Sequence, residues 1–140
     1  MQDITDMRGF INCLEEMGEL KKLPGADLNL EVGALTERSA EKEGPALLFS
    51  HFKDHPEGFR VISNVFRTCR RTAPAMGLPT ELKGVDFLYA WRKKLAAFKP
   101  VPVEQVEGGP ILENQMAEDE VDLYKFPTPT WHELDGGPYL

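Results

Sequence analysis

Long hydrophobic runs, cysteine and an excess of basic charge are all scarce in this sequence of 140 residues. No stretch approaches the roughly 18 consecutive apolar residues that a membrane-spanning helix needs, so we expect no membrane span. The N-terminal MQDITDMRGF lacks the apolar core of an export signal, which predicts a cytoplasmic protein. Sixteen Lys and Arg against 23 Asp and Glu give a net charge of −7, which argues against a general nucleic-acid-binding function.

Cysteine and histidine are too few and too scattered to predict a metal centre. Cys13 and Cys69 are isolated in the sequence, so we expect free thiols, with Cys13 packed in the core; a disulfide or metal pair is the alternative. His51 and His55 have the spacing that brings two side chains together on a helix. The apolar run before them and Pro56 after them oppose a helix, so we interpret both as loop histidines.

The first half of the chain predicts a small mixed α/β layer. Residues 6–17 carry one apolar stripe at helical spacing, with Asp6 as N-cap and Gly18 as the C-terminal stop. A second helix is expected over 29–41, capped by Asn29. The segments 20–23, 46–52 and 59–66 are short and apolar, and we interpret them as strands. Members of the two stripes are Met7, Phe10, Ile11, Leu14 and Met17 in the first helix, and Leu28, Val32 and Leu35 in the second.

The second half predicts two more helices and then a change of character. A short helix is expected over 68–76 and a longer one over 81–98, with Leu88, Trp91, Leu95 and Phe98 as its apolar stripe. Pro100 and Pro102 end it, and we place the boundary between two regions, 1–100 and 101–140, there. Residues 103–107 and 111–116, on either side of a Gly-Gly-Pro turn, are candidate strands.

Charged clusters offer one candidate binding site. Arg67, Arg70 and Arg71 lie around Thr68, a plausible helix cap, and this arrangement suits a phosphate or carboxylate. The alternative is a solvated face whose arginines pair with nearby acids. The acidic run Glu118–Asp122 is interpreted as solvated, because general acid–base catalysis needs a buried carboxylate with a shifted pKa.

The closing stretch FPTPTWHELDGGPYL, residues 126–140, has a backbone restricted by prolines at one end and a conformationally free Gly-Gly pair near the other. Its prolines forbid a helix and favour an extended chain over 128–131, whereas Gly136 and Gly137 permit positive φ or a close backbone approach. Asp135 could accept a hydrogen bond from His132 or turn the chain toward the glycines. We interpret the stretch as a connector that delivers Tyr139 and Leu140 into a following strand; the alternative is the wall of a ligand site.

The same stretch resembles a segment of the UbiD-type (de)carboxylases. That pattern combines Val-Asp-Leu, Pro-x-Pro and His-x-x-Asp-Gly-Gly-x-Tyr, found here at 121–123, 127–129 and 132–139. The stretches FINCLEEMGELKKL, LNLEVGALTERSAEKEGPALLF and ISNVFRTCRRTAPAMGL resemble earlier parts of the family, so the likeness spans nearly the whole chain. It is loosest over 51–60 and 79–110.

The resemblance implies an N-terminal α/β domain followed by the lead-in to a split-barrel flavin domain. It implies non-oxidative decarboxylation or carboxylation of aromatic or α,β-unsaturated acids with prenylated FMN, a divalent metal (Mn or Mg) and K. The family's catalytic, cofactor and metal residues lie beyond the Gly-Gly-x-Tyr segment, so none is assigned here. The site-adjacent residues it implies are His132, Asp135, Gly136, Gly137 and Tyr139.

These implications lead to two functional hypotheses. In the first, the chain is the N-terminal part of a decarboxylase that is homo-oligomeric when complete, with a small acid substrate, and is inactive without its flavin and C-terminal domains. An edge prepared for a further strand would then be left open. In the second, it is a non-catalytic scaffold or regulatory subunit that docks on a separate flavin-domain partner through 100–140. An unrelated small α/β protein is a third, weaker hypothesis.

Overall fold

The computed structural model describes residues 4–139. Among them, three strands form one sheet in the order β1-β2-β3, with β1 parallel to β2 and β2 antiparallel to β3. The mixed α/β class is therefore confirmed. None of the described helices is long and apolar enough to cross a membrane. The elements are α1 (Met7–Glu16), β1 (Leu20–Pro24), α2 (Glu31–Glu41), β2 (Ala46–Ser50), β3 (Arg60–Ser63), α3 (Cys69–Ala75) and α4 (Gly84–Ala97).

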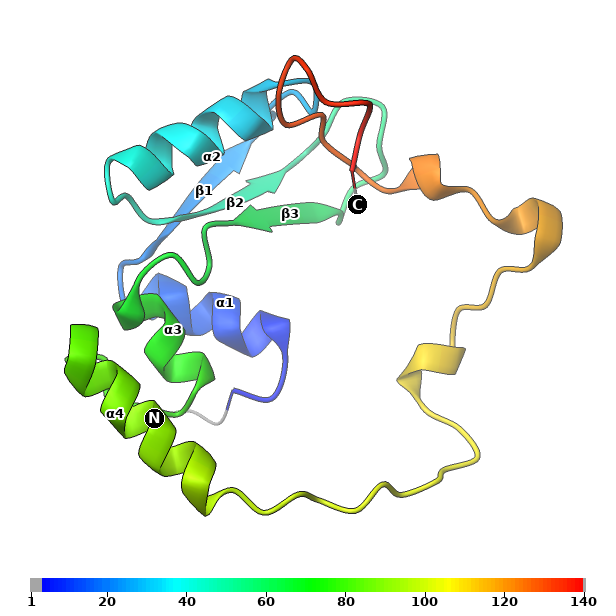
Figure 1. The fold of residues 1–140 in the computed structure, drawn as a ribbon. Coiled ribbons are helices and arrows are strands. Elements are labelled where there is room, and N and C mark those ends of the chain that lie inside the picture. The colour runs from blue at the N-terminus through cyan, green and yellow to red at the C-terminus, as the bar shows by residue number, and fades with distance from the viewer. Residues whose placement is uncertain (1–3, 140) are drawn as a thin grey trace.

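The central strand β2 has apolar side chains on both faces, because successive residues of a strand point to opposite sides. Leu47 and Phe49 pack with Val32 of α2, whereas Ala46 packs with Phe10 and Leu14 of α1. The sheet therefore lies between α1 and α2, as Figure 1 shows. Two small cores, one on each face, hold this layer together.

The local signals at the ends of α1 are confirmed. The carboxylate of Asp6 accepts a hydrogen bond from the Gly9 amide at 2.7 Å, as an N-cap does. Gly18 follows the helix with φ of +70°, a left-handed conformation that glycine adopts readily.

The predicted N-cap of α2 is wrong. Asn29 makes no capping bond; the residue before the helix is Leu30, at φ +71°. Instead, Asn29 forms a parallel β-bridge with Thr130. The start of α2 is held by Glu31, whose carboxylate accepts from the Asp27 amide at 2.7 Å. Asn29 thus bonds to a segment about 100 residues later in the chain, and this tertiary contact outweighs its local preference for the N-cap position.

Both predicted later helices exist, but the apolar stripe of α4 is only partly right. Thr68 caps α3, accepting from the Arg71 amide at 3.3 Å. Phe87 and Trp91 of α4 pack against the cluster of Ala73 and Leu78. The other members of the predicted stripe, Leu88, Leu95 and Phe98, are exposed. The reason is that α3 and its following loop cover one face of α4 and no described element covers the next.

The strands predicted at 103–107 and 111–116 are absent. Residues 98–126 are exposed along their whole length and contain three short 3-10 turns, at Pro110–Leu112, Glu118–Glu120 and Leu123–Lys125. Figure 1 shows this segment as an open arc between α4 and the sheet. A strand needs a neighbour to receive its backbone hydrogen bonds, and no segment of the described chain pairs with residues 103–107 or 111–116.

Candidate functional site

The closing segment folds back onto the α/β layer just before α2. The Leu30 amide donates to the Thr130 carbonyl at 2.9 Å, and the Thr130 amide donates to the Leu28 carbonyl at 3.0 Å. The Trp131 side chain packs against the core that contains Val32 and Phe49. Pro127 and Pro129 are buried as well. The stretch recognised in the sequence is therefore part of the packed structure at its proline end.

Gly33, in the first turn of α2, sets how closely the closing segment can approach. It is buried, and a Cβ atom built on it would overlap the backbone of Trp131, lying 2.7 Å from its carbonyl carbon. Sequence reasoning missed this residue. A glycine inside a helical pattern was the available signal, since it costs helix stability unless a close approach requires it.

Asp135 organises the turn that follows Trp131. Its Oδ2 accepts from the backbone amides of Trp131 at 3.1 Å and His132 at 2.9 Å. The His132 ring is largely exposed, and its Nδ1 lies 3.8 Å from Asp135 Oδ1. The carboxylate thus binds the backbone of this turn more closely than it binds the imidazole.

Gly136 and Gly137 allow the end of the closing segment to fold back onto Pro129. Gly137 has φ of +154°, which side chains rarely allow, and the Tyr139 amide donates to the Pro129 carbonyl at 3.2 Å. A Cβ on Gly136 would lie 3.3 Å from the Tyr139 hydroxyl. The predicted delivery of Leu140 into a following strand lies outside the described residues.

A mostly apolar hollow of about 290 Å³ separates the closing segment from β3. Phe59 and Phe126 meet edge to face across it, with ring centroids 5.8 Å apart. Tyr139 is the one member of the site-adjacent set that lines it; His132, Asp135, Gly136 and Gly137 do not. The residues that line it include Phe59, Arg60, Val61, Pro127, Trp131 and Tyr139.

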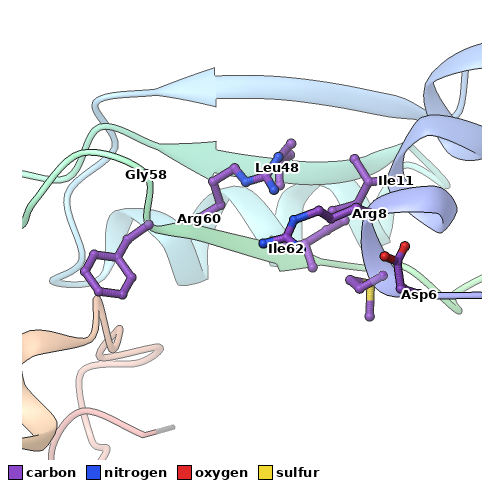
Figure 2. Close-up of a pocket in the computed structure, with 9 residues that line it drawn as sticks. Asp6, Arg8, Ile11, Leu48, Gly58, Arg60 and Ile62 are labelled. Atoms are coloured by element: carbon purple, nitrogen blue, oxygen red, sulfur yellow. The ribbon is translucent and has the colours of Figure 1, made fainter. Parts of the chain in front are cut away.

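A second hollow, of about 410 Å³, adjoins the first through Phe59 and Arg60 and lies on the α1 side of the sheet (Figure 2). Arg8 enters it from α1 and Arg60 from β3. Neither arginine stands out in the sequence, because the two are 52 positions apart and only the fold brings them to one place.

Two of the three arginines predicted to bind an anion, Arg70 and Arg71, pair with the carboxylate of Glu19. Arg71 is fully buried and donates to Glu19 at 3.1 Å and to the Gly44 carbonyl at 2.9 Å. Arg70 lies 3.1 Å from the other Glu19 oxygen, and Arg67 is exposed. An external anion would have to compete with Glu19 for two of the three. Anion binding here stays a prediction.

The histidines and cysteines do not gather into a cluster. Within residues 4–139, no group of three or more His, Cys, Asp or Glu is arranged to hold a metal ion. His51 contacts the Ser50 hydroxyl at 2.9 Å, and His55 contacts the Lys53 carbonyl at 3.0 Å. Cys13 and Cys69 are free, as predicted. Burial, with a smaller effect of Glu16, raises the pKa of the Cys13 thiol, which disfavours a reactive thiolate.

Two matches to known families cover most of the sequence. Residues 11–91 match the family described as 3-octaprenyl-4-hydroxybenzoate carboxy-lyase N-terminal domain, and residues 103–140 match the Rift-related domain of the same carboxy-lyase. A curated relative is the pyrrole-2-carboxylic acid decarboxylase of Pseudomonas aeruginosa, 35% identical over 143 aligned positions. That alignment covers 96% of this chain and 29% of the relative.

Solved structures with the same fold include the vanillic acid decarboxylase of Sedimentibacter hydroxybenzoicus. Its open form, with one truncated component, is 27% identical with a TM-score of 0.81, covering 98% of this chain and 30% of that one. Its closed form is 26% identical with a TM-score of 0.81, covering 99% and 29%. The chain thus spans about 30% of the length of the proteins it matches.

Proposed function

Because this chain belongs to the UbiD family of carboxy-lyases, we propose that it forms the N-terminal part of a non-oxidative decarboxylase or carboxylase. The substrate class we propose is an aromatic or α,β-unsaturated carboxylic acid. The two named relatives support the aromatic class, since pyrrole-2-carboxylic acid and vanillic acid are both aromatic acids. The complete enzyme would be homo-oligomeric and would work in the cytoplasm.

One observation carries this proposal: the two family matches follow each other along the chain, at 11–91 and 103–140. The structure gives the second match a physical connection to the first. The closing segment, through Thr130 and Trp131, is bonded and packed to the start of α2. In the proposed enzyme, the α/β layer would thereby fix the position of chain that leads toward the flavin domain.

We further propose that prenylated FMN, with a divalent metal and K, supplies the chemistry as an electron sink while carbon dioxide leaves. Residues 4–139 do not fit such a group. They offer no cluster of metal-binding side chains, and their one fully buried cation, Arg71, is already bound to Glu19. We therefore derive no step of the reaction from these residues, and we assign the reacting groups to polypeptide other than this chain.

An activity measurement on the purified 140-residue chain tests this assignment. We expect no retained flavin absorbance after incubation with prenylated FMN, Mn²⁺ and K⁺ followed by gel filtration, and no carbon dioxide from pyrrole-2-carboxylate or vanillate. A polypeptide that combines these residues with a flavin domain should release carbon dioxide under the same conditions. Activity in the 140-residue chain itself would show that the catalytic groups had been misplaced.

The second candidate, a scaffold or regulatory subunit, is favoured by the exposed apolar residues of α4 and of 98–126 and by the two-component name of the Sedimentibacter enzyme. This hypothesis predicts that the 140-residue chain binds a separately expressed flavin domain and raises its activity. The enzyme hypothesis predicts instead that the gene continues in the same reading frame into a flavin domain.

A further inference from the structure

The second hollow lies beside α1, on the face of the sheet that α1 covers. Leu20 and Ala46, at one end of their strands, are covered by Phe10 and Leu14 of α1. Toward the other end the same face carries Leu48 of β2 and then Arg60 and Ile62 of β3, and these three residues line the hollow together with residues of α1. Figure 2 shows them beside α1.

Two exposed arginines, one from α1 and one from β3, line this hollow. Arg8 extends from α1 and Arg60 from β3, and their side chains point toward one another in Figure 2. Neither makes a salt bridge to any residue between 4 and 139, whereas Lys22, Arg38, Arg70 and Arg71 do. A carboxylate placed between two guanidinium groups can accept hydrogen bonds from both.

The acids near the hollow do not supply that carboxylate. Asp6 is the one acid in its lining, and its Oδ1 is bound to the Gly9 amide as the cap of α1. The adjoining hollow on the same strands adds Glu57, His51 and Lys22, and Lys22 is held by Glu15 at 2.6 Å. The lining itself therefore keeps one positive charge in excess, two arginines against one aspartate, in a chain of net charge −7.

The floor beneath the two exposed arginines includes three apolar side chains. Ile11 and Leu48 are buried, at 7% and 5% exposed, and Ile62 lies beside them. Phe59 closes the side that adjoins the first hollow. The hollow has a volume of about 410 Å³ and is open to solvent, so a ligand bound there would keep part of its surface exposed.

We propose that this hollow is a binding site for a small aromatic carboxylate, held by Arg8 and Arg60 through its carboxylate and by Ile11, Leu48 and Ile62 through its ring. Binding at this place requires no flavin, no metal and no reaction. It is therefore a property of the α/β layer that holds or fails independently of the proposed decarboxylase function.

The test is a titration of the 140-residue chain with benzoate, followed by the NMR methyl signals of Ile11, Leu48 and Ile62. We expect saturable shifts of these signals with a dissociation constant on the order of 1 mM. Benzamide, which has the same shape but no charge, should bind at least about tenfold more weakly, because it loses the charge-assisted hydrogen bonds.

Matched variants separate this site from general attraction to a charged surface. Arg8→Gln and Arg60→Gln should each weaken benzoate binding about five- to tenfold. Arg38→Gln, on α2 at the other face of the sheet, should leave it unchanged. If a glutamine variant loses its fold by circular dichroism, Arg8→Lys and Arg60→Lys replace it, and they should weaken binding less than the loss of charge does.

Several results would overturn the proposal. They are methyl shifts that do not saturate below about 10 mM benzoate, equal binding of benzoate and benzamide, or an Arg38→Gln variant that weakens binding as much as Arg60→Gln. Shifts confined to residues outside the hollow would also overturn it, since they would place the ligand elsewhere.

Discussion

At the scale of single residues, Gly33 sets the fit between α2 and the closing segment. In most helix interiors, replacing glycine by alanine stabilises the helix, because alanine restricts the unfolded chain and has the higher helix propensity. Here the added methyl group would meet the Trp131 backbone, which belongs to a hydrogen-bonded segment and has little freedom to withdraw. The steric cost therefore decides the sign of the effect.

Gly33→Ala should accordingly lower the free energy of unfolding by about 1–3 kcal/mol and change the fluorescence of Trp131. Chemical denaturation and tryptophan emission measure both effects. Gly108→Ala is the control, because nothing lies within 4 Å of a Cβ placed there. A Gly33→Ala chain as stable as the wild type would mean that the closing segment is not held against α2.

At the scale of elements, one buried charge ties α3 to β1 and to the turn before β2. Arg71 of α3 is fully buried, and it bonds to Glu19, next to β1, and to the Gly44 carbonyl. Its Nε and Nη2 have no partner in the described part of the chain. The charge of Arg71 is therefore balanced by a single carboxylate, which makes the packing of three segments depend on Glu19.

Glu19→Gln should destabilise the protein by about 3 kcal/mol, because it leaves a buried cation without its counter-charge. Thermal or urea unfolding gives the value. Lys22→Gln serves as the comparison: it removes the exposed Lys22–Glu15 pair and should cost less than about 1 kcal/mol. Equal effects of the two substitutions would show that Arg71 is sufficiently solvated without Glu19.

At the scale of the whole molecule, the chain divides into a packed layer and an exposed arc. Every residue from 98 to 126 is exposed, and the apolar ones include Val103 at 99% and Ile111 at 87%. Segments with few buried contacts open at low free-energy cost. Proline at 100 and 102 keeps the arc from continuing α4 as a helix.

A glutamate-specific protease should therefore cut first after Glu104, Glu107 or Glu113. Cleavage after Glu37 of α2 should be roughly ten times slower or more, although Glu37 is also exposed, because the helix must open before it fits a protease. Mass spectrometry of a short digestion identifies the order. First cuts inside α2 would contradict this division of the chain.

Local sequence rules were sufficient where a residue's neighbours in the chain decide its conformation. The Asp6 cap and the left-handed Gly18 frame α1, and Thr68 caps α3, because a cap depends on the three or four residues beside it. The continuous apolar run of β2 predicted a buried strand, and the stripe of α1 predicted the burial of Phe10, Ile11 and Leu14, although Met7 of that stripe is exposed. The contact of the closing stretch with the start of α2 was not predicted from the sequence.

The tertiary structure decided everything that depends on distant contacts. It left Leu88, Leu95 and Phe98 exposed because α3 covers a different face of α4, and it turned Asn29 from a cap into a strand partner of Thr130. It buried Arg71 and brought Arg8 and Arg60 to one hollow. Periodicity shows which side of a helix can be buried, but whether another element covers that side depends on contacts between residues far apart in the sequence.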